Sequence, residues 1–302
     1  MTASPSVTGD PRASVPTVLR QLLGSSRPVS WINTAYPFAA AYLLAGGGVT
    51  PILLIGTIWF LVPYNLLMYG INDVFDYESD LRNPRKGGIE GIVLARRWHR
   101  VILWAATLTN LPFVLLLLAW GDGRSAMVLA VSVGAVIAYS APALRFKERP
   151  GLDSITSSTH FVSPAVLGLT LAGATFTPGV LAALAAFFVW GMASHAFGAV
   201  QDIRADRTAG IASVATALGA AGTVRVAFLG YLAAGLLLLP TGWPMALAGA
   251  LALPYAASTA AFLNLSDEEC ERANAGWRRF IWLNLLTGFL LTQLFIWISR
   301  AS

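Results

Sequence analysis

The sequence predicts an all-α membrane protein with about nine transmembrane helices. The chain has 302 residues, of which 56% are hydrophobic and only 12% are charged. Its mean hydropathy is +0.65. Apolar stretches of about 20 residues, the length that one helix needs to cross a bilayer, recur along most of the chain. This combination is typical of polytopic membrane proteins and excludes an ordinary soluble globular protein.

The first 26 residues differ from the rest, because they are rich in Ser, Thr and Pro. They lack the apolar centre of a signal peptide, so the first apolar stretch after them should also act as the targeting signal. We therefore expect residues 1–26 to be a polar N-terminal tail. Residues 27–302 should form a single transmembrane domain.

Nine apolar stretches follow the tail, and we expect each to cross the membrane as a helix. In order, they are residues 29–47, 51–71, 98–119, 124–142, 157–175, 178–199, 222–240, 243–263 and 278–299. Asn33 and Pro37 interrupt the first stretch. His160 and Pro164 interrupt the fifth, so these two are the least regular.

The charges predict the orientation. All but two of the 20 Lys and Arg residues lie in the tail, in the loops after even-numbered stretches or at the adjoining starts of the next stretches, and the exceptions are Arg124 and Arg300. By the positive-inside rule, the N-terminus and these loops face the cytoplasm and the C-terminus lies outside. The net charge of +5 follows from this topology and does not indicate nucleic-acid binding. The single Cys270 can form no internal disulfide.

An acidic run, NDVFDYESD at residues 72–80, follows the second stretch directly. Asn72, Asp76 and Asp80 are four positions apart, so a continuous helix would place them within an arc of about 80° over roughly 12 Å. Carboxylates at a helix C-terminus oppose its dipole and repel one another unless a cation relieves them. The alternative is a solvated helix end. We favour Mg²⁺ binding, with Asp73 assisting from the flank.

A second acidic run, DIRAD at residues 202–206, follows the sixth stretch. Asp202 and Asp206 are one helical turn apart, and Gly210 should end this helix. Facing the first run, this pair would complete a two-sided clamp for Mg²⁺ around a diphosphate. Asp and Asn oxygens suit this hard cation, and the sequence has no Cys/His cluster of the kind that binds zinc.

Basic residues near the acidic runs are candidates for binding phosphate oxygens. Arg145 and Lys147 follow the fourth stretch, and Arg82 lies just behind the first acidic run. For each, the alternative is that it only sets the topology. His195 lies seven residues before Asp202, two turns deeper on the same face. It would line a substrate chamber or accept a proton, or else make a structural hydrogen bond.

Three motifs together resemble the UbiA-type intramembrane prenyltransferases: NDxxDxxxD from Asn72, YSxPxLRFK from Tyr139 and DxxxDxxxG from Asp202. The resemblance covers the chain from about residue 27. It implies a nine-helix bundle around a central cavity that opens sideways to lipid, with both acidic motifs at the cytoplasmic mouth. It also implies a metal–diphosphate role for both motifs, with Asp76, Asp202 and Asp206 essential for turnover. Tyr139, Arg145 and Lys147 match positions that cap the diphosphate.

The amino-acid sequence around the two acidic runs most resembles the carotenoid-elongating branch of that family, the lycopene elongases. That likeness implies transfer of a five-carbon dimethylallyl group from its diphosphate, with Mg²⁺, to lycopene entering from the bilayer. The deeper parts of the apolar stretches show no obvious polar pocket for a carboxylate-bearing acceptor. Other acceptors remain open: a quinone precursor, a tetrapyrrole or a lipid. Two functions of other classes fit the sequence less well. An ion or metabolite transporter would place its carboxylates near the membrane midplane, whereas here they lie at one interface. A structural or assembly protein would not need two matched pairs of carboxylates.

Overall fold

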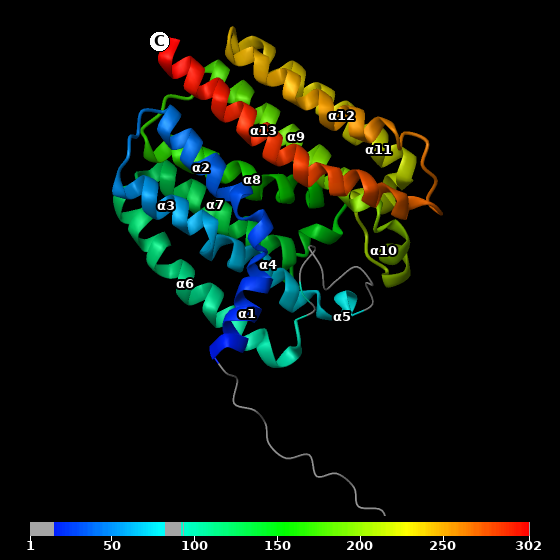
Figure 1. The fold of residues 1–302 in the computed structure, drawn as a ribbon. Coiled ribbons are helices and arrows are strands. Elements are labelled where there is room, and N and C mark those ends of the chain that lie inside the picture. Colours follow the sequence, from blue (N-terminus) through cyan, green and yellow to red (C-terminus); the bar gives the residue numbers. More distant parts are fainter. Residues whose placement is uncertain (1–14, 82–91, 93, 302) are drawn as a thin grey trace, which may run out of the picture.

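The computed structural model describes residues 15–81, 92 and 94–301, and this part of the chain contains helices and no β-strand. The helices form one bundle (Figure 1). The predicted all-α class is therefore confirmed. The α-helices are α1 Val15–Ser26, α2 Ile32–Leu44, α3 Pro51–Leu61, α4 Pro63–Phe75, α5 Tyr77–Asp80, α6 His99–Trp120, α7 Gly123–Ser140, α8 Leu152–Leu171, α9 Pro178–Val200, α10 Ile203–Ala209, α11 Val214–Leu237, α12 Leu253–Ala260 and α13 Asn274–Ala301.

Within the described residues, six helical segments are long and apolar enough to cross a membrane: Pro51–Phe75, Arg96–Trp120, Gly123–Ser140, Pro178–Val200, Val214–Thr241 and Cys270–Arg300. Each contains or overlaps a predicted span. The other three predicted spans correspond to α2, α8 and the segment Met245–Ala260, which are shorter or more polar. The total of nine crossings therefore stays a prediction.

Helix α8 is polar because protein surrounds it. It packs against α2, α7 and α9, and buries Thr156, Ser158 and Ser163 among other side chains. A helix enclosed by its neighbours does not need an apolar surface toward lipid. Hydropathy therefore placed the start of this helix at residue 157, whereas it begins at Leu152.

The predicted span 51–71 is two helices, because the chain breaks at Pro63. Proline has no N–H and its ring clashes with the preceding turn, so the helical hydrogen-bond pattern is interrupted there. At this break the Phe60 carbonyl accepts hydrogen bonds from Thr34 Oγ1 and Asn65 Nδ2, both at 2.7 Å. These buried side chains satisfy the carbonyl and hold α2, α3 and α4 together.

The N-terminal segment differs from the expected tail. Residues 15–26 form α1, which packs against α4 and α6. Leu22 contacts the buried core. The chain then turns at Arg27, whose φ of 49° is left-handed. This turn brings the start of the transmembrane domain against the end of α4.

The buried side chains form two large clusters. One lies on α2, α3, α4, α6, α7 and α8, and the other on α9, α10, α11, α12 and the segment that leads into α13. Figure 1 shows α5 and α10 at the same end of the bundle and the C-terminus at the opposite end. We call the helices of these two clusters the two half-bundles. The two acidic motifs lie partly on α5 and α10, so they meet at one end of the half-bundles.

Candidate active site

A cavity of about 1630 Å³ is lined by residues of both half-bundles. Polar residues from the end of α4 and from α10 contribute to it, including Asn72, Asp76, Asp202 and Asp206. Most of the remaining wall is apolar or aromatic. In that wall the Trp190 and Phe280 rings stack with their centroids 5.6 Å apart. The two acidic motifs therefore face one shared chamber.

The first motif does not follow one continuous helix. Helix α4 ends at Phe75, and Asp76 is its C-cap with φ −96° and ψ 2°. The Asp76 N–H donates to the Asn72 carbonyl at 2.9 Å, so these two residues remain one turn apart. The predicted ladder through Asp80 is wrong in this respect, because α5 begins only after the interruption. The Asp80 side chain lies outside the described part of the structure, so its ligand role stays a prediction.

Lys147 connects the loop after α7 with the first motif. Its Nζ forms an ion pair with Asp76 Oδ1 and lies 3.3 Å from Asn72 Oδ1. Ser140 Oγ donates to the same Asn72 oxygen at 3.1 Å. The Lys147 side chain is only 9% exposed. Burial lowers the pKa of its ammonium group, although the neighbouring Asp76 carboxylate acts in the opposite direction.

Arg145 lies farther from the motif than Lys147. Its Nη2 is 3.9 Å from Asp76 Oδ1, and the guanidinium also pairs with Glu148. The backbone of Arg145 is left-handed, with φ 42°, which turns the chain into the 3₁₀ turn Phe146–Glu148. The structure thus brings both basic residues of the predicted phosphate site close to Asp76.

The donor set of the first motif fits a hard cation. The side-chain oxygens of Asn72 and Asp76 converge on one positive centre, the Lys147 ammonium group. Carboxylate and amide oxygens are the ligands that Mg²⁺ prefers. Within the described residues, no group of three His, Cys, Asp or Glu side chains is arranged to hold a metal ion. The predicted ligand set combines both motifs and includes Asp80, whose side chain lies outside the described part of the structure.

The second motif has the predicted local structure. Asp202 is the N-cap of α10, and the Asp206 N–H donates to the Asp202 carbonyl at 2.8 Å. Gly210, with φ 72°, ends the helix as predicted. Both aspartates line the same cavity as Asn72 and Asp76. The pair is thus positioned by the end of α9 and by the short helix that follows it.

Asp73 is placed differently from its neighbours in the first motif. Its side chain is fully buried, and Arg27 Nη2 lies 3.1 Å from its Oδ1. The Arg27 guanidinium also lies over the Tyr69 ring, 4.2 Å from its centroid, and lines the cavity. Arg27 was not predicted to line the cavity. The predicted metal-binding role of Asp73 stays a prediction, and Arg82 lies outside the described residues.

His195 lines the cavity, one of the alternatives expected for it. Its Nε2 is 3.2 Å from the Tyr139 hydroxyl, and its Nδ1 is 3.1 Å from Ser154 Oγ. The His160 ring meets the Tyr139 ring edge to face at a centroid distance of 5.3 Å. Three helices, α7, α8 and α9, therefore contribute one polar cluster to the chamber wall.

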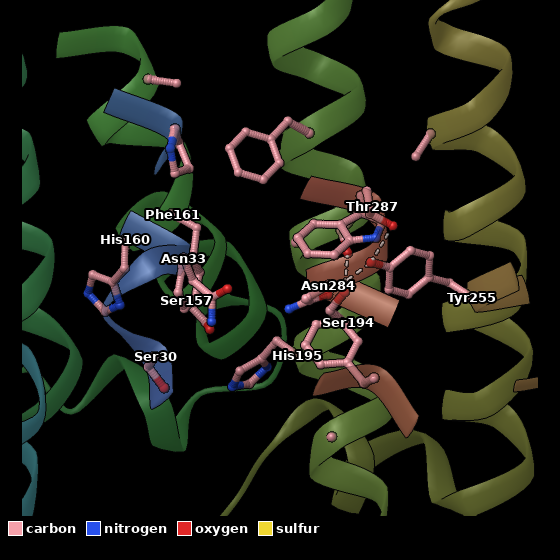
Figure 2. Close-up of a pocket in the computed structure, with 18 of the residues that line it drawn as sticks. Ser30, Asn33, Ser157, His160, Phe161, Ser194, His195, Tyr255, Asn284 and Thr287 are labelled. Atoms are coloured by element: carbon pink, nitrogen blue, oxygen red, sulfur yellow. Dashed lines mark hydrogen bonds between the residues drawn. The ribbon is translucent and has the colours of Figure 1, made fainter. Parts of the chain in front are cut away.

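The deeper chamber is more polar than we expected from the sequence. Figure 2 shows Asn33 and Ser157 on one side of the cavity and Asn284 and Thr287 on the other. The Tyr255 hydroxyl lies 2.9 Å from both Asn284 Oδ1 and Thr287 Oγ1. Polar side chains inside predicted spans are the signal that could have revealed these residues.

Comparison with known proteins agrees with this architecture. Residues 34–286 match the UbiA prenyltransferase family. The chain is 56% identical over 287 residues to the C(50) beta-cyclic carotenoids biosynthesis protein LbtBC of Dietzia sp. (strain CQ4), which covers 95% of this chain but only 66% of that relative. It is 50% identical over 282 residues to the lycopene elongase/hydratase of Corynebacterium glutamicum, with 93% of this chain and 98% of the relative covered.

Solved structures share the fold. A UbiA homolog from Archaeoglobus fulgidus bound to DMAPP and Mg²⁺ superposes with a TM-score of 0.64 at 19% identity, covering 88% of this chain and 98% of that one. A digeranylgeranylglyceryl phosphate synthase superposes with a TM-score of 0.62 at 13% identity, covering 90% and 98%. At these identities the likeness establishes the helical fold alone. Because the family match spans most of the bundle and the curated relatives are half identical, this chain belongs to the UbiA prenyltransferase family of membrane enzymes.

Proposed function

We propose that the protein transfers a dimethylallyl group from dimethylallyl diphosphate to lycopene, with Mg²⁺, in the biosynthesis of long-chain carotenoids. The names of the Dietzia and Corynebacterium relatives support the carotenoid assignment. The Archaeoglobus neighbour, which is bound to DMAPP and Mg²⁺, supports the donor and the metal. The observation that carries the proposal is the single cavity that both acidic motifs line.

The size of the cavity supports a reaction between two substrates. Small-molecule pockets usually measure about 300–1,000 Å³. The cavity of about 1630 Å³ exceeds this range. It therefore has room for a small allylic diphosphate and for the end of a long apolar acceptor together. The mostly apolar wall suits a hydrocarbon that enters from the bilayer.

The reaction separates charge, and the chain's residues are arranged to stabilise both products of that separation. Asn72, Asp76, Asp202 and Asp206, with Asp80, would hold the metal, which when bound supplies positive charge to the diphosphate leaving group. Lys147 and Arg145 would stabilise the same developing negative charge, since both lie beside Asp76. Tyr139 and Arg82 would complete the diphosphate site.

The organic half of the reaction takes place in the apolar part of the chamber. The allylic C–O bond breaks with its electrons on the diphosphate, which leaves an allylic cation. The Trp190, Phe280 and Trp277 rings stack in the cavity wall, where the aromatic surface left uncovered would stabilise such a cation, and the surrounding wall limits the access of water. A terminal alkene of the acceptor then forms the new C–C bond. The resulting tertiary cation loses a proton or captures water.

We propose the same orientation that the charges predict. The end of the bundle with both acidic motifs faces the cytoplasm, the N-terminus lies inside and the C-terminus outside. Figure 1 supports this arrangement, because α5 and α10 lie at one end of the bundle and the C-terminus lies at the other. A water-soluble diphosphate donor would then reach the cavity from the cytoplasm.

Expression in a lycopene-accumulating bacterium tests this function. The wild type should yield pigments heavier by one or two five-carbon units, and Asp202→Asn should abolish them while the protein remains in the membrane. Asp122→Asn is the matched control, because Asp122 caps α7 away from the cavity and Asn also caps helices well. Full pigment production by Asp202→Asn would refute the acidic clamp.

The metal requirement has its own test in isolated membranes. Removal of divalent cations with EDTA should stop diphosphate release, and added Mg²⁺ should restore it. Release of diphosphate without a heavier carotenoid would keep the prenyltransferase function. It would move the acceptor to a quinone precursor, a tetrapyrrole or a lipid. Metal-independent solute uptake without diphosphate release would instead favour a transporter.

A further inference from the structure

A chain of hydrogen bonds runs from a buried carboxylate to the wall of the cavity. The Asp153 Oδ1 accepts the Ser154 N–H at 2.7 Å, and Ser154 Oγ lies 3.1 Å from His195 Nδ1. His195 Nε2 lies 3.2 Å from the Tyr139 hydroxyl. Asp153 is fully buried, whereas His195 and Tyr139 line the chamber. Ser154 makes the two links with different atoms, its backbone N–H toward Asp153 and its Oγ toward His195, so the network places a buried negative charge behind the imidazole.

We propose that His195, acting through the Tyr139 hydroxyl, accepts the proton that ends the prenyl transfer. This inference rests on the proposed function, because it assigns the base for its last step. Histidine is the side chain whose ordinary protonation range suits a base near neutral pH. When His195 becomes positively charged, the Asp153 carboxylate behind Ser154 offsets that charge in a medium of low dielectric constant.

The position of His195 suits the last step better than the first. His195 lies on α9 five residues before the helix ends at Val200, which corresponds to about 7.5 Å along the helix axis, and Asp202 follows as the N-cap of α10. The acidic residues hold the diphosphate end, so this distance places the imidazole toward the part of the chamber where the acceptor would lie. The second histidine of the cavity, His160, contacts the ring of Tyr139 edge to face, whereas among the described residues it is His195 that lies within hydrogen-bond distance of the Tyr139 hydroxyl.

The proposed step balances for either ending. In proton loss, a C–H bond next to the tertiary cation breaks, its electrons form the new C=C bond, and the proton passes to the Tyr139 oxygen. In water capture, a solvent water forms the C–O bond and its extra proton passes to the same oxygen. In both cases the original Tyr139 hydroxyl proton moves to His195 Nε2. The imidazolium returns its proton to solvent when the product leaves.

The ratio of products separates this role from a structural one. Purified protein in lipid nanodiscs receives labelled dimethylallyl diphosphate, lycopene and Mg²⁺. Released diphosphate, prenylated carotenoid and dimethylallyl alcohol are then measured together. General acid–base catalysis contributes about 10²–10⁴-fold, so His195→Gln should lower carotenoid formed per diphosphate released by about tenfold or more, even if another base substitutes in part. Without the base, the new C–C bond of the tertiary cation breaks again, its electrons restore the acceptor alkene, and the released allylic cation takes up water and loses a proton to solvent. The missing product should therefore appear as dimethylallyl alcohol.

Two further variants make the test decisive. Tyr139→Phe keeps the aromatic ring beside His160 and removes only the hydroxyl, so it should lower the same ratio. His99→Gln is the matched control, since His99 bonds to the Leu94 carbonyl and does not line the cavity. It should keep the wild-type ratio.

Two results would overturn the role of His195. The first is an unchanged ratio and product composition in folded His195→Gln, or in Tyr139→Phe if the first variant does not fold. The second is loss of diphosphate release with an unchanged ratio, since His195 would then serve ionisation. Failure of the proposed acceptor differs from both, because the wild type itself would release diphosphate without a heavier carotenoid. The ratio is then measured with the acceptor that the wild type does prenylate.

Discussion

Helices α2 and α8 approach each other backbone to backbone at Gly168. A Cβ atom added to Gly168 would lie 2.5 Å from the Phe38 carbonyl oxygen and 3.0 Å from the Tyr42 nitrogen, whereas ordinary contacts measure 3.4–4 Å. The overlap with the oxygen is therefore about 1 Å. Both neighbouring atoms belong to the α2 backbone, so no side-chain rotation can relieve the clash. Membrane helices commonly use small residues for such close packing.

We predict that Gly168→Ala destabilises the protein by separating α2 from α8. Forcing an extra methyl group into a packed interface costs about 1–3 kcal/mol. For domains of 150–250 residues, each kcal/mol lowers the melting temperature by about 2–4 °C, so a drop of several degrees is expected. Thermal unfolding of the detergent-solubilised protein measures it.

Gly134→Ala is the control for this prediction. Gly134 lies within α7, is exposed, and has no atom within 4 Å of an added Cβ. Replacing a helical Gly by Ala without a clash should stabilise by about 0.5–1 kcal/mol. If Gly168→Ala unfolds at the same temperature as Gly134→Ala or above it, the reasoning about the α2–α8 contact is wrong.

Three other predictions concern single side chains. Lys147→Met should reduce diphosphate release by about 10²–10³-fold while the protein stays in the membrane, since a buried positive charge beside Asp76 is lost; near-normal release would contradict this. Hydrogen bonds from the Ala220 N–H and from Arg207 lower the pKa of the Asp267 carboxyl group in the folded protein below its usual value of 3.8. The ionised Asp267 therefore stabilises the fold above pH 3.8, and this stabilisation is lost as the pH falls through the pKa of the folded state. The melting temperature of the wild type should therefore fall more steeply than that of Asp267→Asn between about pH 5 and pH 3, and parallel curves would exclude the contribution. Ser213→Ala should cost about 1 kcal/mol in thermal unfolding, because Ser213 and Thr216 form a capping box at the start of α11, whereas Ser299→Ala near the C-terminus should be neutral.

Local signals explain how much of the fold was predictable. Apolar stretches of membrane-spanning length predicted helices close to their observed positions, because lipid-facing helices must be apolar along their length. The same signal failed where protein covers a helix. It placed the start of α8 five residues late, and it gave no indication of α1, whose Leu22 packs against the bundle while its polar side chains resemble a tail.

Breaks in helices were predictable only in part. The sequence shows Pro63, yet the span 51–71 was predicted as one helix, because transmembrane helices tolerate proline when other groups satisfy the backbone. Whether they do depends on Thr34 and Asn65, which reach the Phe60 carbonyl only in the folded bundle. The end of α4 at Phe75 was likewise not predicted, since residues 72–80 were expected to follow one continuous helix.

The membrane class, the helical fold, the two acidic motifs and the family resemblance could all be predicted from the amino-acid sequence. Each rests on composition or on spacing between residues that are close along the chain. Three features became visible in the folded bundle alone. Asp76 and Asp202 line one cavity, Lys147 binds the oxygens of the first motif, and His195 lies between Tyr139 and Ser154. These arrangements depend on how separate helices pack, and local spacing contains no information about the distances between them.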